Sequence, residues 1–215
     1  DGDEDVVFVV GTQMLIYLNP SGAMDRFFAG STVFDHLNPI SLATAAYQTA
    51  PPRVVELADL NGDGKPDLVV GTSPGMASHY YINDGSGGFT PNSFQPIGGE
   101  DRDCRAIFVT DLNKDGFADV LLAHNGQANM VGFFSASGLS RTYDVGSETD
   151  ATFAIGAGDM NMDGVMDVVT GNRGETNKVY LGAVGGGGTW TATLLAGAFA
   201  IREANGDAVP ASTGK

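Results

Sequence analysis

Three copies of one short acidic pattern contain the residues of this sequence that are best suited to chemistry. The copies read DLNGDGKPDLVVG from Asp59, DLNKDGFADVLLA from Asp111 and DMNMDGVMDVVTG from Asp159. Each places Asp, Asn, Asp and Asp at relative positions 1, 3, 5 and 9, with Gly at position 6 and an apolar run directly afterwards. Carboxylate, amide and backbone carbonyl oxygens are the ligands that Ca²⁺ prefers. The pattern therefore predicts a calcium site that leads into a β-strand.

Alternate side chains of such a loop can point inward, and the Gly permits the left-handed backbone of a tight reversal. Position 7 varies among the copies, which suits a residue that contributes only its backbone carbonyl. The predicted ligands of the three loops are Asp59, Asn61, Asp63, the Lys65 carbonyl and Asp67; Asp111, Asn113, Asp115, the Phe117 carbonyl and Asp119; and Asp159, Asn161, Asp163, the Val165 carbonyl and Asp167.

Two other interpretations of the pattern are weaker. An EF-hand shares its first half but needs a bidentate Glu at position 12 and flanking helices. Position 12 is Val70, Leu122 or Thr170 in this chain. A plain surface turn rich in Asn, Asp and Gly would explain a single copy, but it does not explain three copies that agree at five positions.

Composition limits the classes of protein that fit. The chain has 215 residues and is 42% hydrophobic, which is enough for one folded domain with a substantial core. A net charge of −15 argues against nucleic acid or an anionic membrane as partner. No apolar run is long enough to cross a membrane. Calcium dependence suits a secreted, extracellular or cell-surface location, where weak calcium sites fill.

Cysteine usage agrees with a fold held by metal rather than by disulfides. Cys104 is the only cysteine, so no disulfide can form within the chain. Bound calcium would stabilise the native state in its place. We expect Cys104 to be a small buried apolar residue.

The segments between the loops supply short β-branched strands. Residues 6–11 and 14–18 form the first two, and 23–52 read as an irregular insertion or one helical turn. Residues 53–60 lead into the first loop, 67–72 lead out of it, and 79–84 and 87–97 follow as a third and fourth strand. The second and third copies repeat this order.

A fourth, decayed copy lies near the end of the sequence, where Glu203, Asn205 and Asp207 hold positions 1, 3 and 5. We expect this loop to bind calcium weakly or not at all. Successive copies begin 52, 48 and 44 residues apart. Periods of about 40–50 residues with four short strands each indicate an all-β fold, a β-propeller of about four four-stranded blades. A β-sandwich would not require a metal loop at a fixed phase.

The predicted single domain, 1–215, divides into blades at about 1–52, 53–103, 104–150 and 151–196. Asp1, Gly2 and Asp5 match the second half of a loop, and residues 197–212 match a first strand and the decayed loop. The two ends therefore complete one shared blade of a closed four-blade ring, or the chain is part of a larger ring. A start inside a loop indicates a processed product or the ordered part of a longer chain.

The D-x-N-x-D-G-x-x-D loops, each followed by an apolar strand, resemble the FG-GAP/VCBS repeats of integrin α-subunit propellers and many secreted proteins. The resemblance covers three full copies and two partial ones. It implies a calcium-binding propeller in which the loop joins the two inner strands of a blade and the ion rigidifies it. That family usually has seven blades, whereas this chain holds about four.

The favoured function is a non-catalytic, calcium-stabilised module for adhesion or assembly, with an extracellular protein or glycan as partner. Loops opposite the metal face are expected to make the contacts. Residues 99–104 and 146–151, which read GEDRDC and GSETDA, recur just before a first strand. They are expected to form polar connections between blades, or a contact surface.

Two alternatives stay open. A lectin would stack sugars on exposed aromatic side chains, with the candidates Tyr80, Tyr81, Phe133, Phe134 and Trp190, although aromatic residues in strands usually lie in the core. A polysaccharide-active enzyme would use histidines and nearby acids, with the candidates His36, His79, His124, Asp35, Glu100 and Asp101, but no repeated spacing joins them.

Overall fold

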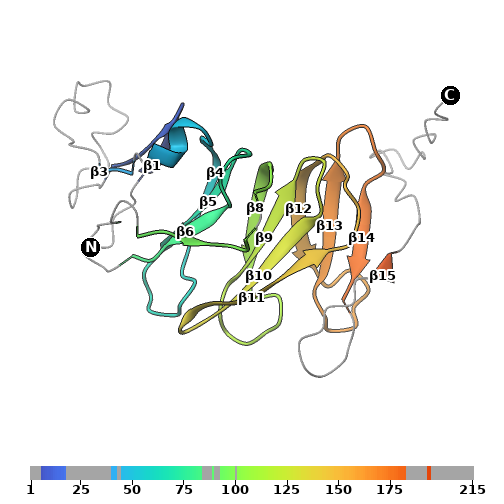
Figure 1. Ribbon diagram of the computed structural model, residues 1–215. Helices are drawn as coiled ribbons and strands as arrows, with labels where there is room; N and C mark the ends of the chain where they lie inside the picture. The colour runs from blue at the N-terminus through green and yellow to red at the C-terminus, as the bar shows by residue number, and fades with distance from the viewer. Residues whose placement is uncertain are drawn as a thin grey trace, which may run out of the picture.

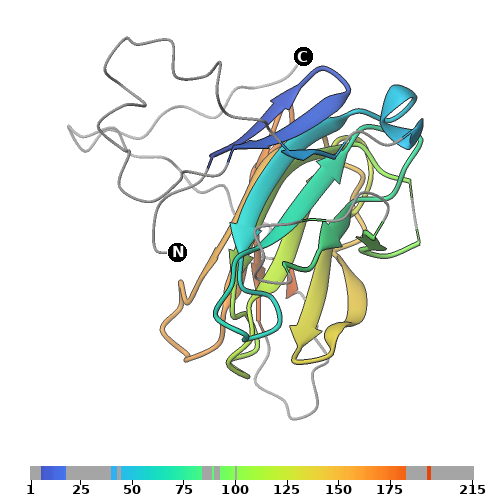
Figure 2. The ribbon, with the colours of Figure 1, turned by 90° about the vertical axis from the view of Figure 1, so that its left-hand side faces the viewer.

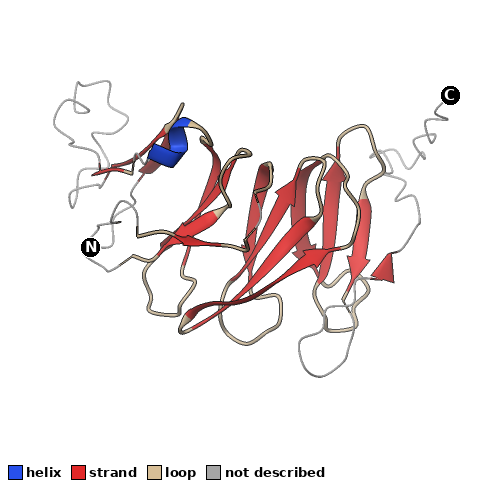
Figure 3. Cartoon of the chain, viewed as in Figure 1, coloured by secondary structure: helices blue, strands red, loops and turns tan. Residues whose placement is uncertain are grey.

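A computed structural model describes residues 6–17, 40–42, 45–83, 89, 93–99, 101–182 and 193–194. Apart from one 3₁₀ turn, every regular element in this part of the chain is a β-strand (Figure 3). The elements are β1 (Val6–Val10), β2 (Gln13–Tyr17), β3 (Ile40–Ser41), η2 (Ala45–Gln48), β4 (Pro52–Ala58), β5 (Asp67–Thr72), β6 (His79–Tyr81), β7 (Gln95–Pro96), β8 (Cys104–Thr110), β9 (Asp119–His124), β10 (Asn129–Ser135), β11 (Gly138–Val145), β12 (Thr152–Gly158), β13 (Asp167–Asn172), β14 (Lys178–Leu181) and β15 (Thr193–Leu194).

Consecutive strands pair antiparallel to form four separate sheets. Sheet 1 contains β1 to β3, sheet 2 contains β4 to β7, sheet 3 contains β8 to β11, and sheet 4 contains β12 to β15. Figure 1 shows the sheets following one another in chain order, and Figure 2 views the same row from the side of sheet 1. The first strands lie beside one another, β4 against β8 and β8 against β12.

The second strands of sheets 2 and 3 are completely buried. All six residues of β5 and all six of β9 are buried, because sheets pack against both of their faces. This explains why these strands read as continuous apolar runs rather than as alternating ones. The first strands β4, β8 and β12 are only partly covered.

The hydrophobic core lies between successive sheets rather than inside any one of them. Between sheets 1 and 2, Met14 and Ile16 pack with Leu68, Val70 and Tyr81. The other two interfaces are built in the same way. Their central residues are Val69, Tyr80, Cys104, Val120 and Leu122 between sheets 2 and 3, and Leu121, Val131, Phe133, Val168 and Tyr180 between sheets 3 and 4.

These observations confirm the predicted all-β class. The turn η2 falls within the region predicted to contain an irregular loop or one helical turn. The predicted closed ring is not seen among the described residues, since sheets 1 and 4 lie at opposite ends of the row (Figure 1). In the described residues, no helix has the length and apolar character needed to span a membrane.

Candidate metal-binding loops

Each predicted loop joins the first two strands of one sheet. Residues 59–66 connect β4 to β5, residues 111–118 connect β8 to β9, and residues 159–166 connect β12 to β13. The Gly at position 6 has positive φ in all three loops, 81° at Gly64, 92° at Gly116 and 87° at Gly164. The predicted reversal therefore occurs where the Gly pattern placed it.

Position 4 of each loop is left-handed as well, which the sequence pattern did not reveal. Gly62 occupies it in the first loop, with φ 77°, but Lys114 and Met162 occupy it in the other two, each with φ 61°. Non-Gly residues in this region cost about 1 kcal/mol or more. The loop hydrogen bonds must outweigh that cost, because the same backbone recurs in all three copies.

The Asp at position 1 organises the backbone of its loop. Its Oδ1 accepts the N–H of position 5, at 3.1 Å for Asp59, 3.0 Å for Asp111 and 3.0 Å for Asp159. Its Oδ2 accepts the N–H of the Gly at position 6, at 2.7, 2.9 and 2.9 Å. One carboxylate thus holds the reversal in each copy.

The residues at positions 3 and 5 complete the turn. The amide oxygen of the Asn accepts the N–H of position 5 at 3.0, 2.9 and 3.0 Å. The carboxylate at position 5 accepts the N–H of position 7 at 2.9, 3.0 and 2.8 Å. The Asn amide also donates to that carboxylate in every loop. Three segments of different sequence therefore adopt one hydrogen-bonded geometry.

The Asp at position 9 connects the loop to the next strands. Asp67, Asp119 and Asp167 are all fully buried. One oxygen of each accepts the N–H of position 2, at 3.0, 3.0 and 2.9 Å. The other accepts a backbone N–H at or just beyond the end of the third strand, from Asn83, Phe134 and Gly182, at 2.8, 3.0 and 2.8 Å. Burial raises the pKa of Asp67, and it raises the pKa of Asp119 to about 6.

The donor chemistry of the loops fits a hard cation. Every predicted ligand is an oxygen, from carboxylates, one amide and one carbonyl per loop, which is the set that Ca²⁺ takes. Within the described residues, no three Asp, Glu, His or Cys side chains lie close enough together to hold an ion. The loop carboxylates accept hydrogen bonds from the backbone N–H groups of their own loops. Asp67 uses one acceptor position on each oxygen in this way, and a carboxylate has about four.

Neighbouring loops also touch. Lys114 Nζ donates to the Gly164 carbonyl oxygen at 2.6 Å, which joins the second loop to the third. A Cβ at Gly62 would lie 3.0 Å from the Phe117 ring, so the first loop packs closely against the second. The three loops therefore form one continuous acidic edge of the row of sheets.

Polar connections between sheets lie at the opposite ends of the first strands, in the segments predicted to make them. Asp103 pairs with Arg53 of sheet 2 at 3.1 Å and with Arg105, and it accepts from Asn125. Arg102 is buried, and one of its guanidinium nitrogens lies 2.7 Å from both the Ala128 carbonyl and Asp144. Lys178 pairs with Asp150 and lies 3.8 Å from Glu148. The structure thus supports polar connections as the function of these segments.

A row of larger side chains also lies at this end. Arg53, Arg105 and Phe153 are each the second residue of a first strand. The Arg105 guanidinium lies 5.2 Å from the centre of the Phe153 ring, and that of Arg173 lies 5.7 Å from it. Phe153 is 37% exposed. The loop pattern does not indicate this row, and the shared strand position is the sequence signal that could have found it.

Four aromatic candidates for sugar stacking are buried, as expected for aromatic residues in strands, so the alternative function of stacking on sugars is wrong for them. Tyr80 is 6% exposed, and Tyr81, Phe133 and Phe134 are at most 1% exposed. The third strands on which they lie are packed on both faces, so adjacent aromatics can both be in the core. Trp190 lies outside the described residues.

The two described histidines are buried. His79 Nδ1 donates to the Ala77 carbonyl at 3.1 Å, and its Nε2 lies 2.6 Å from the Tyr47 hydroxyl. His124 Nδ1 donates to the Ala128 carbonyl at 2.8 Å. Burial lowers the pKa of each to about 4. Their partners differ and they lie in different sheets, so the structure does not bring them together.

The remaining candidates are placed as follows. Asp101 accepts the N–H of Gly75. Cys104 is fully buried, and burial raises the pKa of its thiol to about 12, which confirms the expected buried apolar residue. His36, Asp35, Glu100 and the decayed loop at Glu203, Asn205 and Asp207 lie outside the described residues.

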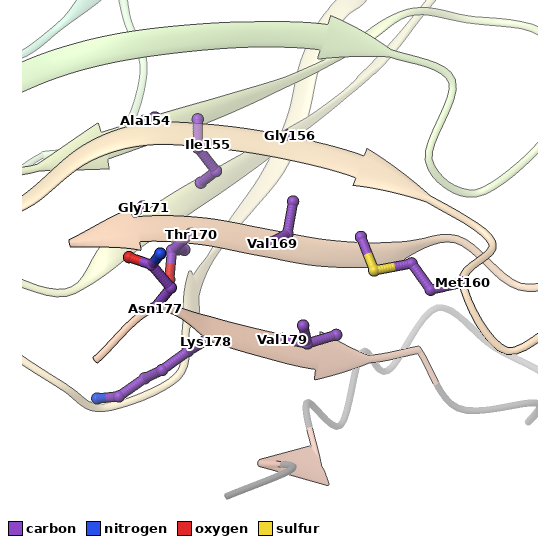
Figure 4. A pocket seen from close by; sticks show the side chains of 10 residues that line it. All are labelled: Ala154, Ile155, Gly156, Met160, Val169, Thr170, Gly171, Asn177, Lys178 and Val179. Atoms are coloured by element: carbon purple, nitrogen blue, oxygen red, sulfur yellow. The ribbon is translucent and has the colours of Figure 1, made fainter. Parts of the chain in front are cut away.

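The described part of the chain also contains a cavity of about 430 Å³ on the outer face of sheet 4. Figure 4 shows side chains of Val169, Val179 and Met160 around it, and Ala154 and Gly171 also line it. None of the predicted ligands lies there. The cavity adjoins the acidic edge through Met160, at position 2 of the third loop.

Comparison with known proteins bears on the loops directly. Residues 59–122 match the family model described as the FG-GAP-like repeat. This segment includes the first two loops and the strands β5 to β8 between them. A search of curated proteins finds no match to the chain. The match confirms the resemblance drawn from the loop pattern: the chain carries an FG-GAP-like repeat at residues 59–122.

Proposed function

We propose that this chain is a non-catalytic, calcium-stabilised β-propeller module through which extracellular proteins adhere or assemble. The observation that carries the proposal is the recurrence of one loop geometry in three sheets, with the same oxygen donors at positions 1, 3, 5, 7 and 9. Calcium would bind the fifteen predicted ligands, five in each loop. An FG-GAP-like repeat in a β-rich chain supports an adhesion or protein-binding module.

Calcium would act on the charge of the acidic edge. The three loops bring nine Asp carboxylates to one edge of a protein whose net charge is already −15. A divalent cation in each loop would offset this repulsion. Binding to the native state alone adds RT ln(1 + [L]/Kd) to stability, and extracellular calcium suffices even for sites with Kd of about 10⁻⁴–10⁻³ M.

The packing of the sheets supports the propeller. Three interfaces in a row use the same faces of successive sheets, and the first strands lie side by side. Continued around an axis, this arrangement closes a ring and removes its free faces. The proposal keeps both predicted forms, a four-blade ring completed by residues 197–212 and a segment of a larger ring.

The partner would bind the end of the sheets opposite the loops. Arg53, Arg105, Phe153 and Arg173 lie there, and Arg and aromatic residues are enriched in protein interfaces. The acidic edge would be reserved for calcium. We therefore place protein recognition on the Arg105–Phe153–Arg173 cluster.

Arrays of extracellular proteins and of glycans, probed with the full chain in calcium, test this placement. We expect retention on a protein that is reduced at least tenfold by Phe153→Ala. The matched control is Tyr143→Ala, which removes another exposed aromatic side chain that also lies near an arginine, Arg141, and it should bind normally. Loss in both variants, or in neither, would contradict the placement. Glycan retention lost in Phe153→Ala would favour the lectin alternative.

A further inference from the structure

The outer face of sheet 4 is the counterpart of faces that are buried elsewhere in the molecule. Loop position 2 and one residue from each of the second and third strands point toward the next sheet. The third-strand residue is identified by its pairing with the second-strand residue. The three equivalent sets are Leu60, Val69 and Tyr80 in sheet 2; Leu112, Leu121 and Val131 in sheet 3; and Met160, Val169 and Val179 in sheet 4.

Only the third set lacks a described cover. Leu60 and Leu112 are 0% and 2% exposed, because the next sheet packs on them. On the outer face of sheet 4, Met160 is 42% exposed, Val169 is partly exposed and Val179 is 9% exposed. In place of a neighbouring sheet, sheet 4 has the 430 Å³ cavity (Figure 4). Its lining is mostly apolar, as the buried counterparts are. The face is therefore built for a further strand layer.

The covered interfaces show which residues fill this place. In sheet 3, Cys104, Ile107 and Val109 of the first strand pack on sheet 2. In sheet 4, Ile155 and Ala157 hold the equivalent positions and pack on sheet 3. Ile107 and Ile155 lie four residues before position 1 of the following loop, and Val109 and Ala157 lie two residues before it. Cys104, at the start of its strand, lies seven residues before position 1.

The same count from Glu203, position 1 of the decayed loop, gives Ala196, Phe199 and Ile201. We propose that residues 196–202 form a first strand that docks on the outer face of sheet 4, with Phe199 and Ile201 filling the cavity against Val169 and Met160. This inference extends the proposed ring by one strand. It depends on neither calcium nor a partner.

A close contact in the structure gives the geometry for a test. A Cβ placed at Gly71 would lie 3.1 Å from the Cβ of Cys104 across the interface between sheets 2 and 3. Disulfides need about 3.5–4.5 Å between these atoms, so a small adjustment suffices. The equivalent pair on the outer face is Gly171 and Ala196. Gly171 has more room, since its nearest atom would be the Ala154 Cβ at 3.2 Å.

The experiment uses the full chain with Cys104→Ala, so that no native thiol remains. Oxidation of Gly171→Cys/Ala196→Cys should give a disulfide within one chain, seen as a monomer without free thiols. A positive control is Val54→Ala/Gly71→Cys with native Cys104, across the described interface between sheets 2 and 3. The change at Val54 makes room for the new side chain and matches Ala154, the equivalent residue of sheet 4. A negative control is Gly171→Cys/Ala200→Cys, because Ala200 is equivalent to Phe108 and Gly156 and faces away. Disulfide-linked dimers, or free thiols where the positive control cross-links, would overturn the docking.

A second measurement does not depend on cross-linking. Phe199→Asp should lower the Tm by about 5 °C or more, because it would place a charge in the cavity. Ala200→Asp should leave the Tm nearly unchanged. Equal Tm values for the two variants would also overturn the proposal. Both measurements are made with calcium chelated as well as bound, so failure here leaves the calcium proposal to be judged separately.

Discussion

Asp67, Asp119 and Asp167 differ from the other loop carboxylates because they are buried and connect two strands. Each accepts one N–H from its own loop and one from the end of the third strand. Asp63, Asp115 and Asp163 lie at the exposed tip and bond only within the loop. At the scale of residues, substitution of the two kinds of carboxylate should therefore have different effects when calcium is absent.

Asp119→Ala should lower the free energy of unfolding by about 2–4 kcal/mol whether or not calcium is present, because two buried N–H groups lose their acceptor. Asp115→Ala should have its main effect only in calcium, because it removes a proposed ligand from the surface. Urea denaturation with calcium and with a chelator measures both. Both variants remove a proposed ligand, so both should lose the stabilisation that calcium gives. An Asp115→Ala variant that is destabilised as much as Asp119→Ala in chelator would contradict this division.

His79 should make stability depend on pH. Its pKa is lowered to about 4 in the folded state, from 6.5, because it is buried among Tyr47, Tyr81 and Phe94. Between these values the unfolded chain binds more protons. The contribution of His79 to the free energy of unfolding is about 3 kcal/mol and is complete above pH 6.5. It declines as the pH falls toward 4 and is lost below pH 4.

The difference in unfolding free energy between the wild-type protein and His79→Phe measures this contribution. Subtraction removes contributions that both proteins share, among them that of Asp119, whose pKa burial raises to about 6. The difference should shrink between pH 6.5 and 4. A difference that stays constant across this range would show that His79 is not buried as the neutral imidazole.

At the scale of elements, the close approach of sheets 2 and 3 depends on Gly71 in β5. A Cβ there would lie 2.5 Å from Cys104 Sγ and 2.6 Å from Val54 Cγ1. Gly71→Ala should therefore lower the free energy of unfolding by about 1–3 kcal/mol. Gly158→Ala, in β12 with no atom within 4 Å of the new Cβ, is the matched control and should be nearly neutral. Thermal or urea denaturation compares them, and equal effects would contradict this packing.

The elements also show how far sequence reasoning reaches. The strands and their order relative to each loop could be predicted, because Asp and Gly mark the loops and β-branched runs mark the strands. The burial of Tyr80 and Tyr81 was expected from the tendency of aromatic residues in strands to lie in the core, but not from alternation, because their strand is covered on both faces. The left-handed backbone at Lys114 and Met162 was hidden as well, since neither residue type signals it.

At the scale of the molecule, the repeat period predicts units but not the angles between them. The loop pattern and an apolar face recur in each sheet, so the order of the sheets follows from the sequence. Ring closure depends instead on small rotations between sheets, which no short motif encodes. The exposed face around Met160 became evident only when its buried counterparts, Leu60 and Leu112, could be compared with it.

Calcium titration by calorimetry, paired with thermal denaturation of the same samples, tests the central claim most directly. The account predicts about three calcium ions bound per chain and a marked rise in Tm. It also predicts that replacing Asp63, Asp115 and Asp163 together with Ala abolishes both. Absence of calcium binding, with a Tm unchanged by chelator, would contradict the assignment of the three loops.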